Sequence, residues 1–215
     1  MNPSVIENVH AALHHGNTSP ALSQRPAIYP ARQPGSVNTE LQQFFTEIQK
    51  LSAVGQLLKP NDISEAINSL VRVEAIRKAT LWNSPWLKDL GIARQLVERG
   101  VELISPNANK QEIASCDLGI TEADYLLPET GTIVLKSSGL KPRAVSLLPR
   151  IHLAIVTPES LRADMHQVFA EVNTPGDPCP YLVFITGPSR TADIELTVTL
   201  GVHGPKELLV WMIKG

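Results

Sequence analysis

The chain has 215 residues, of which 43% are hydrophobic and 19% are charged, the proportions of an ordinary globular domain. A net charge of -2 argues against a nucleic-acid-binding protein, and no apolar run approaches the length of a membrane span. Residues 1–15 lack a cationic start followed by an apolar block, so we expect no secretory signal and a cytoplasmic protein.

Residues 1–36 are predicted to form a short helix and a proline-rich arm outside the main fold. The arm between Thr18 and Ser36 is rich in proline, serine and alanine and has no apolar periodicity, as in an extended linker. The arm would be mobile or pack on a neighbouring subunit. The α/β domain would then comprise residues 37–215.

Helical and strand patterns alternate through this domain. Helices are predicted at 39–51, 61–78, 87–99, 110–116 and 161–172, and strands at 53–58, 80–82, 101–104, 132–135, 151–156, 181–185 and 208–213. The alternation predicts an α/β fold, an open and mostly parallel sheet with helices on both faces. Residues 117–137 favour strand–turn–strand, because Pro128 and Gly131 interrupt any helical period.

The segment 186–195, Thr-Gly-Pro-Ser-Arg-Thr-Ala-Asp-Ile-Glu, is predicted to bind an anion. It follows the apolar run 181–185, a predicted buried strand, and precedes 196–202, a predicted helix. The turn would therefore present backbone N–H groups at the positive end of a helix. The predicted ligand-binding residues here are Gly187, Pro188, Ser189, Arg190, Thr191, Asp193 and Glu195. The alternative is an ordinary turn with good helix-capping residues.

Three carboxylates lie close in sequence, at Glu122, Asp124 and Glu129. Glu129 is the predicted catalytic residue, as a base or a nucleophile, because it adjoins a glycine turn that lets backbone approach a ligand closely. The alternative for each carboxylate is a structural role, as a cap or a solvated side chain.

The turn after Glu129 contributes three further predicted ligand-binding residues, Thr130, Gly131 and Thr132. We expect Gly131 and Gly187 to meet at one edge of the sheet and to frame a common pocket. His203, flanked by a glycine on its C-terminal side in the loop 201–205, is also predicted to face a pocket, whereas His152, inside a predicted strand, is expected to be a packed side chain.

Cys116 and Cys179 are the only cysteines, and no CxxC motif is present. An iron–sulfur cluster needs about four cysteine ligands, so this chain cannot hold one alone. Both cysteines are predicted to be buried small hydrophobic residues, and no metal site is predicted.

Four motifs in this order resemble the lactate-utilisation C protein family, which carries the LUD domain. They are Gly119–Tyr125 (GITEADY), Glu129–Thr132 (ETGT), the segment 186–195 and Gly201–Pro205 (GVHGP). The resemblance implies a fold like the sugar-phosphate isomerase and CoA-transferase group. It also implies a subunit of a three-component system that oxidises L-lactate to pyruvate, with the iron–sulfur clusters on partner proteins and none in this chain. It carries over no catalytic residue, and Glu122 departs from the small residue of many relatives.

Two other functions stay open. The chain could be a stand-alone enzyme that acts on a phosphorylated or CoA-linked small molecule, with Glu129 attacking a thioester by analogy with CoA-transferases. It could also be a regulatory or scaffold protein that senses a metabolite in its pocket and contacts a partner through residues 1–36.

Overall fold

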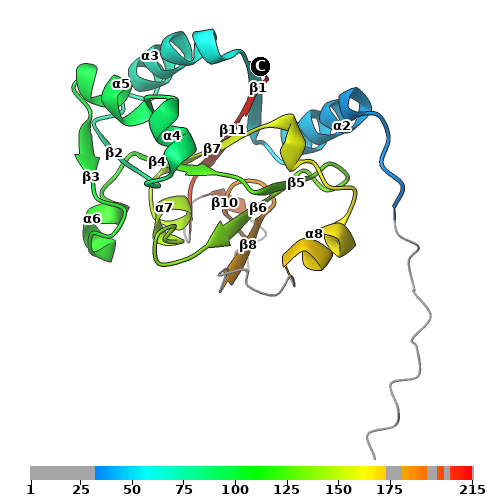
Figure 1. The fold of residues 1–215 in the computed structure, drawn as a ribbon. Helices are drawn as coiled ribbons and strands as arrows, with labels where there is room; N and C mark the ends of the chain where they lie inside the picture. The colour runs from blue at the N-terminus through cyan, green and yellow to red at the C-terminus, as the bar shows by residue number, and fades with distance from the viewer. Residues whose placement is uncertain (1–31, 173–180, 193–197, 201–203, 215) are drawn as a thin grey trace, which may run out of the picture. The chain divides into compact units, whose positions relative to one another are not determined.

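The computed structural model describes residues 32–172, 181–192, 198–200 and 204–214 (Figure 1). The helices are α2 (Val37–Lys50), α3 (Ile63–Val73), α4 (Pro85–Asp89), α5 (Ile92–Glu98), α6 (Lys110–Ala114), α7 (Ala144–Leu147) and α8 (Met165–Val172), with 3-10 turns η1 (Pro60–Asp62) and η2 (Pro158–Ser160). The strands are β1 (Val54–Leu58), β2 (Lys78–Leu81), β3 (Glu102–Ile104), β4 (Leu118–Glu122), β5 (Tyr125–Leu127), β6 (Thr132–Ser137), β7 (Ile151–Val156), β8 (Tyr181–Ile185), β9 (Arg190–Ala192), β10 (Val198–Leu200) and β11 (Glu207–Ile213).

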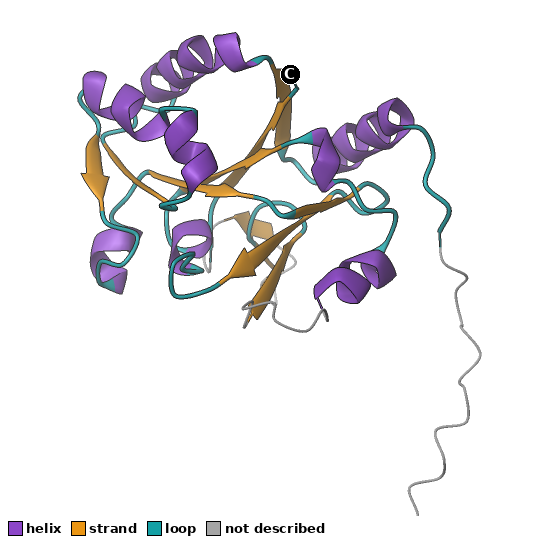
Figure 2. Cartoon of the chain, in the orientation of Figure 1, coloured by secondary structure: helices purple, strands orange, loops and turns teal. Residues whose placement is uncertain are grey.

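The centre of the domain is a six-stranded sheet of order β1-β11-β7-β4-β2-β3 in which every neighbouring pair is parallel. Figure 2 shows helices around this sheet: α3, α4 and α5 lie together, and α6 and α7 lie on the opposite side. The predicted α/β fold with a mostly parallel sheet is confirmed.

Burial on both faces explains the sequences of the central strands. All six residues of β7 are buried, and β4 is buried from Leu118 to Thr121. A parallel sheet covered on both sides requires such continuous apolar runs rather than alternation. On one face α7 lies so close to β4 that only glycine fits at Gly119, where a Cβ atom would be 2.0 Å from the Val145 carbonyl oxygen.

A second, antiparallel sheet of order β5-β6-β8 follows β4. The strand–turn–strand predicted for 117–137 is present, as the β5–β6 hairpin. The prediction that 181–185 is buried was wrong, since β8 lies at the edge of this sheet and Tyr181 is 56% exposed.

The prediction of a helix at 196–202 was also wrong for residues 198–200, the part of this segment that the structure describes. Residues 198–200 form β10, which pairs antiparallel with β9, with Thr199 opposite Thr191. The turn at Gly187 therefore leads into a strand, and the helix end that would favour an anion is not formed by these described residues.

Of the predicted N-terminal arm, residues 1–31 lie outside the described part of the chain. The arm's last described residues attach to the domain: the Arg32 guanidinium pairs with Glu40, with Nη1 2.7 Å from Oε2, and also donates to the Ala163 carbonyl at 3.2 Å. The division at residue 36 stays a prediction.

His152 is a core residue, as expected for a histidine within a strand. Its side chain is 1% exposed, and its Nε2 lies 2.9 Å from the Thr121 hydroxyl. Burial without a countercharge lowers the pKa of His152 to about 3.

We predict a loss of stability on mild acidification that originates at His152. The ring stays neutral in the folded state, whereas the unfolded chain takes up a proton below its ordinary pKa of about 6.5. The contribution of the neutral His152 to the free energy of unfolding is therefore fully present above about pH 6.5. It is lost as the pH falls toward the folded-state pKa of about 3, and the loss between pH 7 and pH 5 is about 2 kcal/mol. Urea unfolding at both pH values should show a smaller loss in His152→Leu, and the wild-type loss in His166→Gln, whose side chain is 71% exposed.

Candidate functional site

The two glycine turns predicted to frame a pocket do come together. Strands β6 and β8 are antiparallel, with Ile133 opposite Ile185, so the turn before β6 and the turn after β8 lie at the same end of the small sheet. The hydroxyls of Thr132 and Thr186 are 2.8 Å apart at this end.

The space beside both glycines is filled by the last turn of α2 instead of being hollow. A Cβ atom on Gly131 would lie 2.8 Å from the backbone nitrogen of Ile48, and one on Gly187 would lie 3.0 Å from Leu51 Cβ. Both glycines have positive φ, 61° and 81°, which other residues rarely adopt. These glycines therefore let two turns pack against one helix end.

Arg190, predicted to bind an anion, caps this same helix. Its Nη2 donates to the Leu51 carbonyl at 2.5 Å and lies 3.1 Å from the Ser52 hydroxyl. A cation at a helix C-terminus faces the negative end of the helix dipole, so its position is explained without a ligand.

The other predicted residues are distributed as follows. Glu129 and Thr130 are exposed on the β5–β6 turn, Thr132 and Pro188 are buried, and the Ser189 backbone N–H donates to the Pro205 carbonyl at 2.9 Å. Thr191 lies in β9, and Asp193, Glu195 and His203 lie outside the described residues. Their roles in ligand binding stay predictions.

We predict a purely structural effect for Arg190→Met. Removing the cap should lower the free energy of unfolding by no more than about 1 kcal/mol, because the side chain is exposed and the gain from a terminal charge is small. Chemical denaturation measures this loss, and titration with L-lactate or sulfate should show unchanged affinity. If Arg190→Met instead loses affinity for either anion, Arg190 is a ligand-binding residue.

The topology of the large sheet points to a different place for a site. From β2 the chain moves outward to β3 at the edge, then crosses back over β2 to β4 and continues in the opposite direction to β7. The order thus reverses between β2 and β4. In open α/β sheets ligands bind outside the carboxyl ends of the strands at such a reversal.

Polar side chains gather at this position. Ser84, the N-cap of α4 just after β2, has its hydroxyl in a short hydrogen bond with Glu122 at the end of β4. The Lys141 ammonium lies 3.2 Å from Glu122 Oε2 and 3.6 Å from Asp124 Oδ1. We call Ser84, Glu122, Asp124 and Lys141 the switch-point cluster.

The switch-point cluster is held rigidly by its surroundings. Lys141 lies 5.2 Å from the centre of the Trp82 ring, and the Trp82 indole N–H donates to the Pro142 carbonyl at 3.0 Å. Asp124 Oδ2 accepts the Lys136 backbone N–H at 2.7 Å. Trp82 therefore braces the loop that carries Lys141 against the end of β2.

Partial burial shapes the electrostatics of the cluster. The side chains of Glu122, Asp124 and Lys141 are 14%, 20% and 29% exposed, so they are accessible but only partly solvated. Burial raises the pKa of Asp124, and the Lys136 N–H and the Lys141 charge offset part of this rise. All four carboxylate oxygens of Glu122 and Asp124 already have a partner within the protein, but a carboxylate oxygen can accept a second hydrogen bond, so each could also accept one from a polar ligand.

Glu129 lies at the opposite end of the β5–β6 hairpin from the cluster. The whole of β5 separates it from Asp124, and three extended residues span about 10 Å. The two carboxylates therefore do not act on one small ligand in this arrangement.

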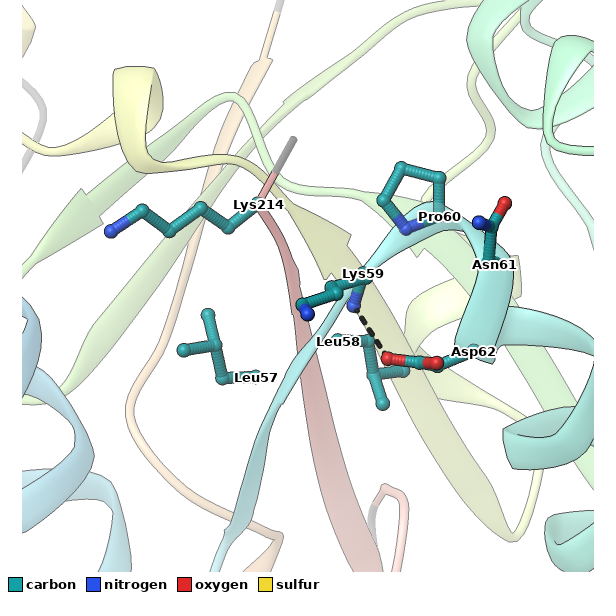
Figure 3. A pocket seen from close by; sticks show the side chains of 7 residues that line it. All are labelled: Leu57, Leu58, Lys59, Pro60, Asn61, Asp62 and Lys214. Atoms are coloured by element: carbon teal, nitrogen blue, oxygen red, sulfur yellow. Dashed lines mark hydrogen bonds between the residues drawn. The ribbon is translucent and has the colours of Figure 1, made fainter.

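A region with two lysines lies at the carboxyl ends of β1 and β11. It is a hollow of about 590 Å³ lined by Leu57–Asp62 and Lys214 (Figure 3). Figure 3 shows Lys214 extending away from Asp62, whose carboxylate accepts the Lys59 backbone N–H at 3.2 Å. Both lysines are exposed, and this hollow is not at the reversal of strand order.

Two further observations concern only the part of the chain that the structure describes. It contains no group of three or more His, Cys, Asp or Glu side chains placed to hold a metal ion. Within the same residues, no helix has the length and apolar character needed to cross a bilayer.

The model of the LUD domain family matches residues 41–213. The chain belongs to the LUD domain family. The family resemblance predicted from the four motifs is thus confirmed, and the switch-point cluster lies wholly within the matched LUD domain.

Individual relatives agree with this assignment. The lactate utilization protein C of Halalkalibacterium halodurans is 36% identical over 154 residues, 68% of this chain and 67% of the relative. The protein of the same name from Shouchella clausii is 32% identical over 154 residues, 69% of this chain and 67% of the relative. The crystal structure of a DUF162 family protein from Deinococcus radiodurans has a TM-score of 0.65 at 22% identity, covering 84% of this chain and all of that one, and it supports the fold of the LUD domain.

Sequence reasoning noted Glu122 as unusual but missed the cluster around it. Ser84, Glu122 and Lys141 are separated by 38 and 19 positions in the sequence. The available signal was that polar residues directly follow the predicted strand at 80–82, but the adjacency of Ser84 to Glu122 depends on a strand order that no local pattern reveals.

Proposed function

We propose that this chain is a component of a lactate-utilisation system that oxidises L-lactate to pyruvate, and that partner proteins carry the iron–sulfur clusters. The observation that carries the proposal is the similarity over 154 residues to proteins named lactate utilization protein C. The chain has only two cysteines, whereas a cluster takes about four cysteine ligands, and this supports placing the iron–sulfur clusters on partner proteins.

We further propose that the chain binds a small 2-hydroxy acid at the switch-point cluster. Such a ligand has a carboxylate, which matches the Lys141 ammonium, and a hydroxyl, which matches an acceptor such as Glu122. The Ser84 hydroxyl adds a group that can donate or accept. This chemistry supports L-lactate as the ligand.

A genetic experiment tests the role of the chain. Deleting its gene should abolish growth on L-lactate while growth on pyruvate continues, and the intact gene should restore it. An affinity-tagged chain should co-purify with cluster-bearing proteins, identified by their iron and sulfide content. Normal growth on lactate without the gene would contradict the proposed role.

A binding experiment tests the site separately. L-lactate should bind the purified chain more tightly than propionate, which has the same carboxylate but no hydroxyl. Equal affinities for the two acids would contradict the proposed hydrogen bond to the lactate hydroxyl. The alternative of a CoA-linked substrate predicts instead a covalent Glu129 adduct after incubation with acyl-CoA, which intact-mass spectrometry detects.

A further inference from the structure

Strand β1 is an edge strand without the usual protection against pairing. Among the described strands it pairs with β11 only, so one side of its backbone is open. Its sequence, Val-Gly-Gln-Leu-Leu, has no charge and no proline, and Val54 and Leu57 are 61% and 54% exposed. Natural edge strands usually carry a lysine, a proline or a bulge that prevents strand addition. This edge is therefore suited to receive another strand.

The surface next to the edge has a hollow that Leu57 borders. It measures about 390 Å³ and is lined by Phe45, Gln49, Ala53, Val54, Gly55 and Leu57. Gly55 and Leu57 lie on the same face of β1, because side chains alternate along a strand. That face is covered by α2, since a Cβ atom on Gly55 would meet the Phe45 ring at 2.3 Å.

We propose that β1 pairs antiparallel with β1 of a second copy of this chain, about a two-fold axis at Gln56. In this register Gln56 faces itself, Val54 faces Leu58 of the second copy, and Leu57 faces Gly55. Phe45 fills the side-chain position of Gly55, so each exposed Leu57 side chain then lies at the hollow beside it, which Phe45 and Gln49 also line. The edge is self-complementary, because the protruding Leu57 of each copy meets the hollow of the other.

The charges at the ends of the strand agree with this pairing. Lys59 of each copy falls opposite Ala53 of the other, next to the C-terminal turn of α2 and the negative end of its dipole. The two Lys59 side chains are about 20 Å apart along the strands, so they do not repel each other appreciably. Five paired residues on each side make a small interface, and we expect a dissociation constant in the micromolar range.

Cysteine cross-linking tests the register. In a chain with Cys179→Ser, Gln56→Cys places two cysteines opposite each other about 5 Å apart, within reach of a disulfide. Val54→Cys is the matched control. In this register position 54 faces position 58 of the second copy, so the two introduced cysteines are four residues, about 13 Å, apart along the strands. Mild oxidation should yield a covalent dimer of Gln56→Cys and leave Val54→Cys monomeric. Equal cross-linking of both variants, or of neither, overturns the proposed register.

Sedimentation tests the association itself. The wild-type chain should form a dimer as its concentration rises to about 500 µM, and Leu57→Lys should weaken the dimer at least tenfold. Val73→Lys is the matched control, because Val73 lies on α3 and is 76% exposed, so it accepts a surface lysine equally well. This variant should leave the dissociation constant of the dimer unchanged. A wild-type chain that remains monomeric overturns the proposal. If deleting residues 1–31 from such a monomer creates the dimer, the chain's own N-terminal segment covers the edge.

Discussion

Gly119→Ala should destabilise the protein strongly, although it adds only one methyl group. The added Cβ atom would lie 2.0 Å from the Val145 carbonyl oxygen and 2.8 Å from Pro149 Cγ. The first is a backbone atom of α7, so relief requires the helix to move away from β4. Overpacking of this kind costs about 3 kcal/mol or more, which lowers the Tm by about 6–12 °C in a chain of this size. Calorimetry and urea unfolding measure both quantities.

Two other glycines provide controls for this experiment. Gly139→Ala should change stability by less than about 0.5 kcal/mol, because no atom lies within 4 Å of the new Cβ. Gly100 has the same open space but a φ of 77°, so Gly100→Ala should cost about 1 kcal/mol from backbone strain alone. A Gly119→Ala protein as stable as Gly139→Ala would mean that α7 does not pack against β4 in solution.

The parts of the fold predicted correctly are those whose sequence pattern has one explanation. Short, β-branched-rich and almost wholly apolar runs such as 151–156 are typical of strands buried on both faces, and they alternate with amphipathic segments such as 39–51. Together they define a parallel sheet. The segment 196–202 shows how the same reasoning fails. Its apolar residues Leu196, Val198, Leu200 and Val202 recur every second position, which is the period of a strand and not of the predicted helix.

The candidate site was harder to predict because proximity in space depends on strand order. Gly131 and Gly187 were correctly expected to approach each other, since a hairpin strand and its antiparallel neighbour bring their turns together. What fills the space between them, the end of α2, comes from a segment about 80 residues earlier than Gly131. Likewise, nothing local links Ser84 to Glu122, which meet because β2 and β4 are neighbours.

Lys141→Met should weaken the proposed binding of L-lactate strongly while the fold persists. Methionine keeps the apolar length of lysine, so contact with Trp82 remains, but the ammonium between Glu122 and Asp124 is lost. A hydrogen bond to a charged group contributes about 1.5–3 kcal/mol, so affinity should fall roughly tenfold to a hundredfold. Calorimetric titration with L-lactate measures this loss, and growth on lactate should fail when the variant replaces the wild-type gene.

The same variant has a structural signature that does not depend on the ligand. Lys141 lowers the pKa of Asp124, so its removal should raise that pKa further above the value in the unfolded chain. A carboxyl group with a raised folded-state pKa binds its proton more tightly when folded, so it lowers stability at neutral pH and less so as the pH falls through that pKa. Lys141→Met should therefore be about 1 kcal/mol less stable than the wild type at pH 7, with the difference shrinking toward pH 4.

Lys59→Met and Lys214→Met, at the hollow beside β1 and β11, are the matched controls for lactate binding. If these two variants lose lactate binding and Lys141→Met does not, the ligand binds at that hollow and not at the reversal of strand order.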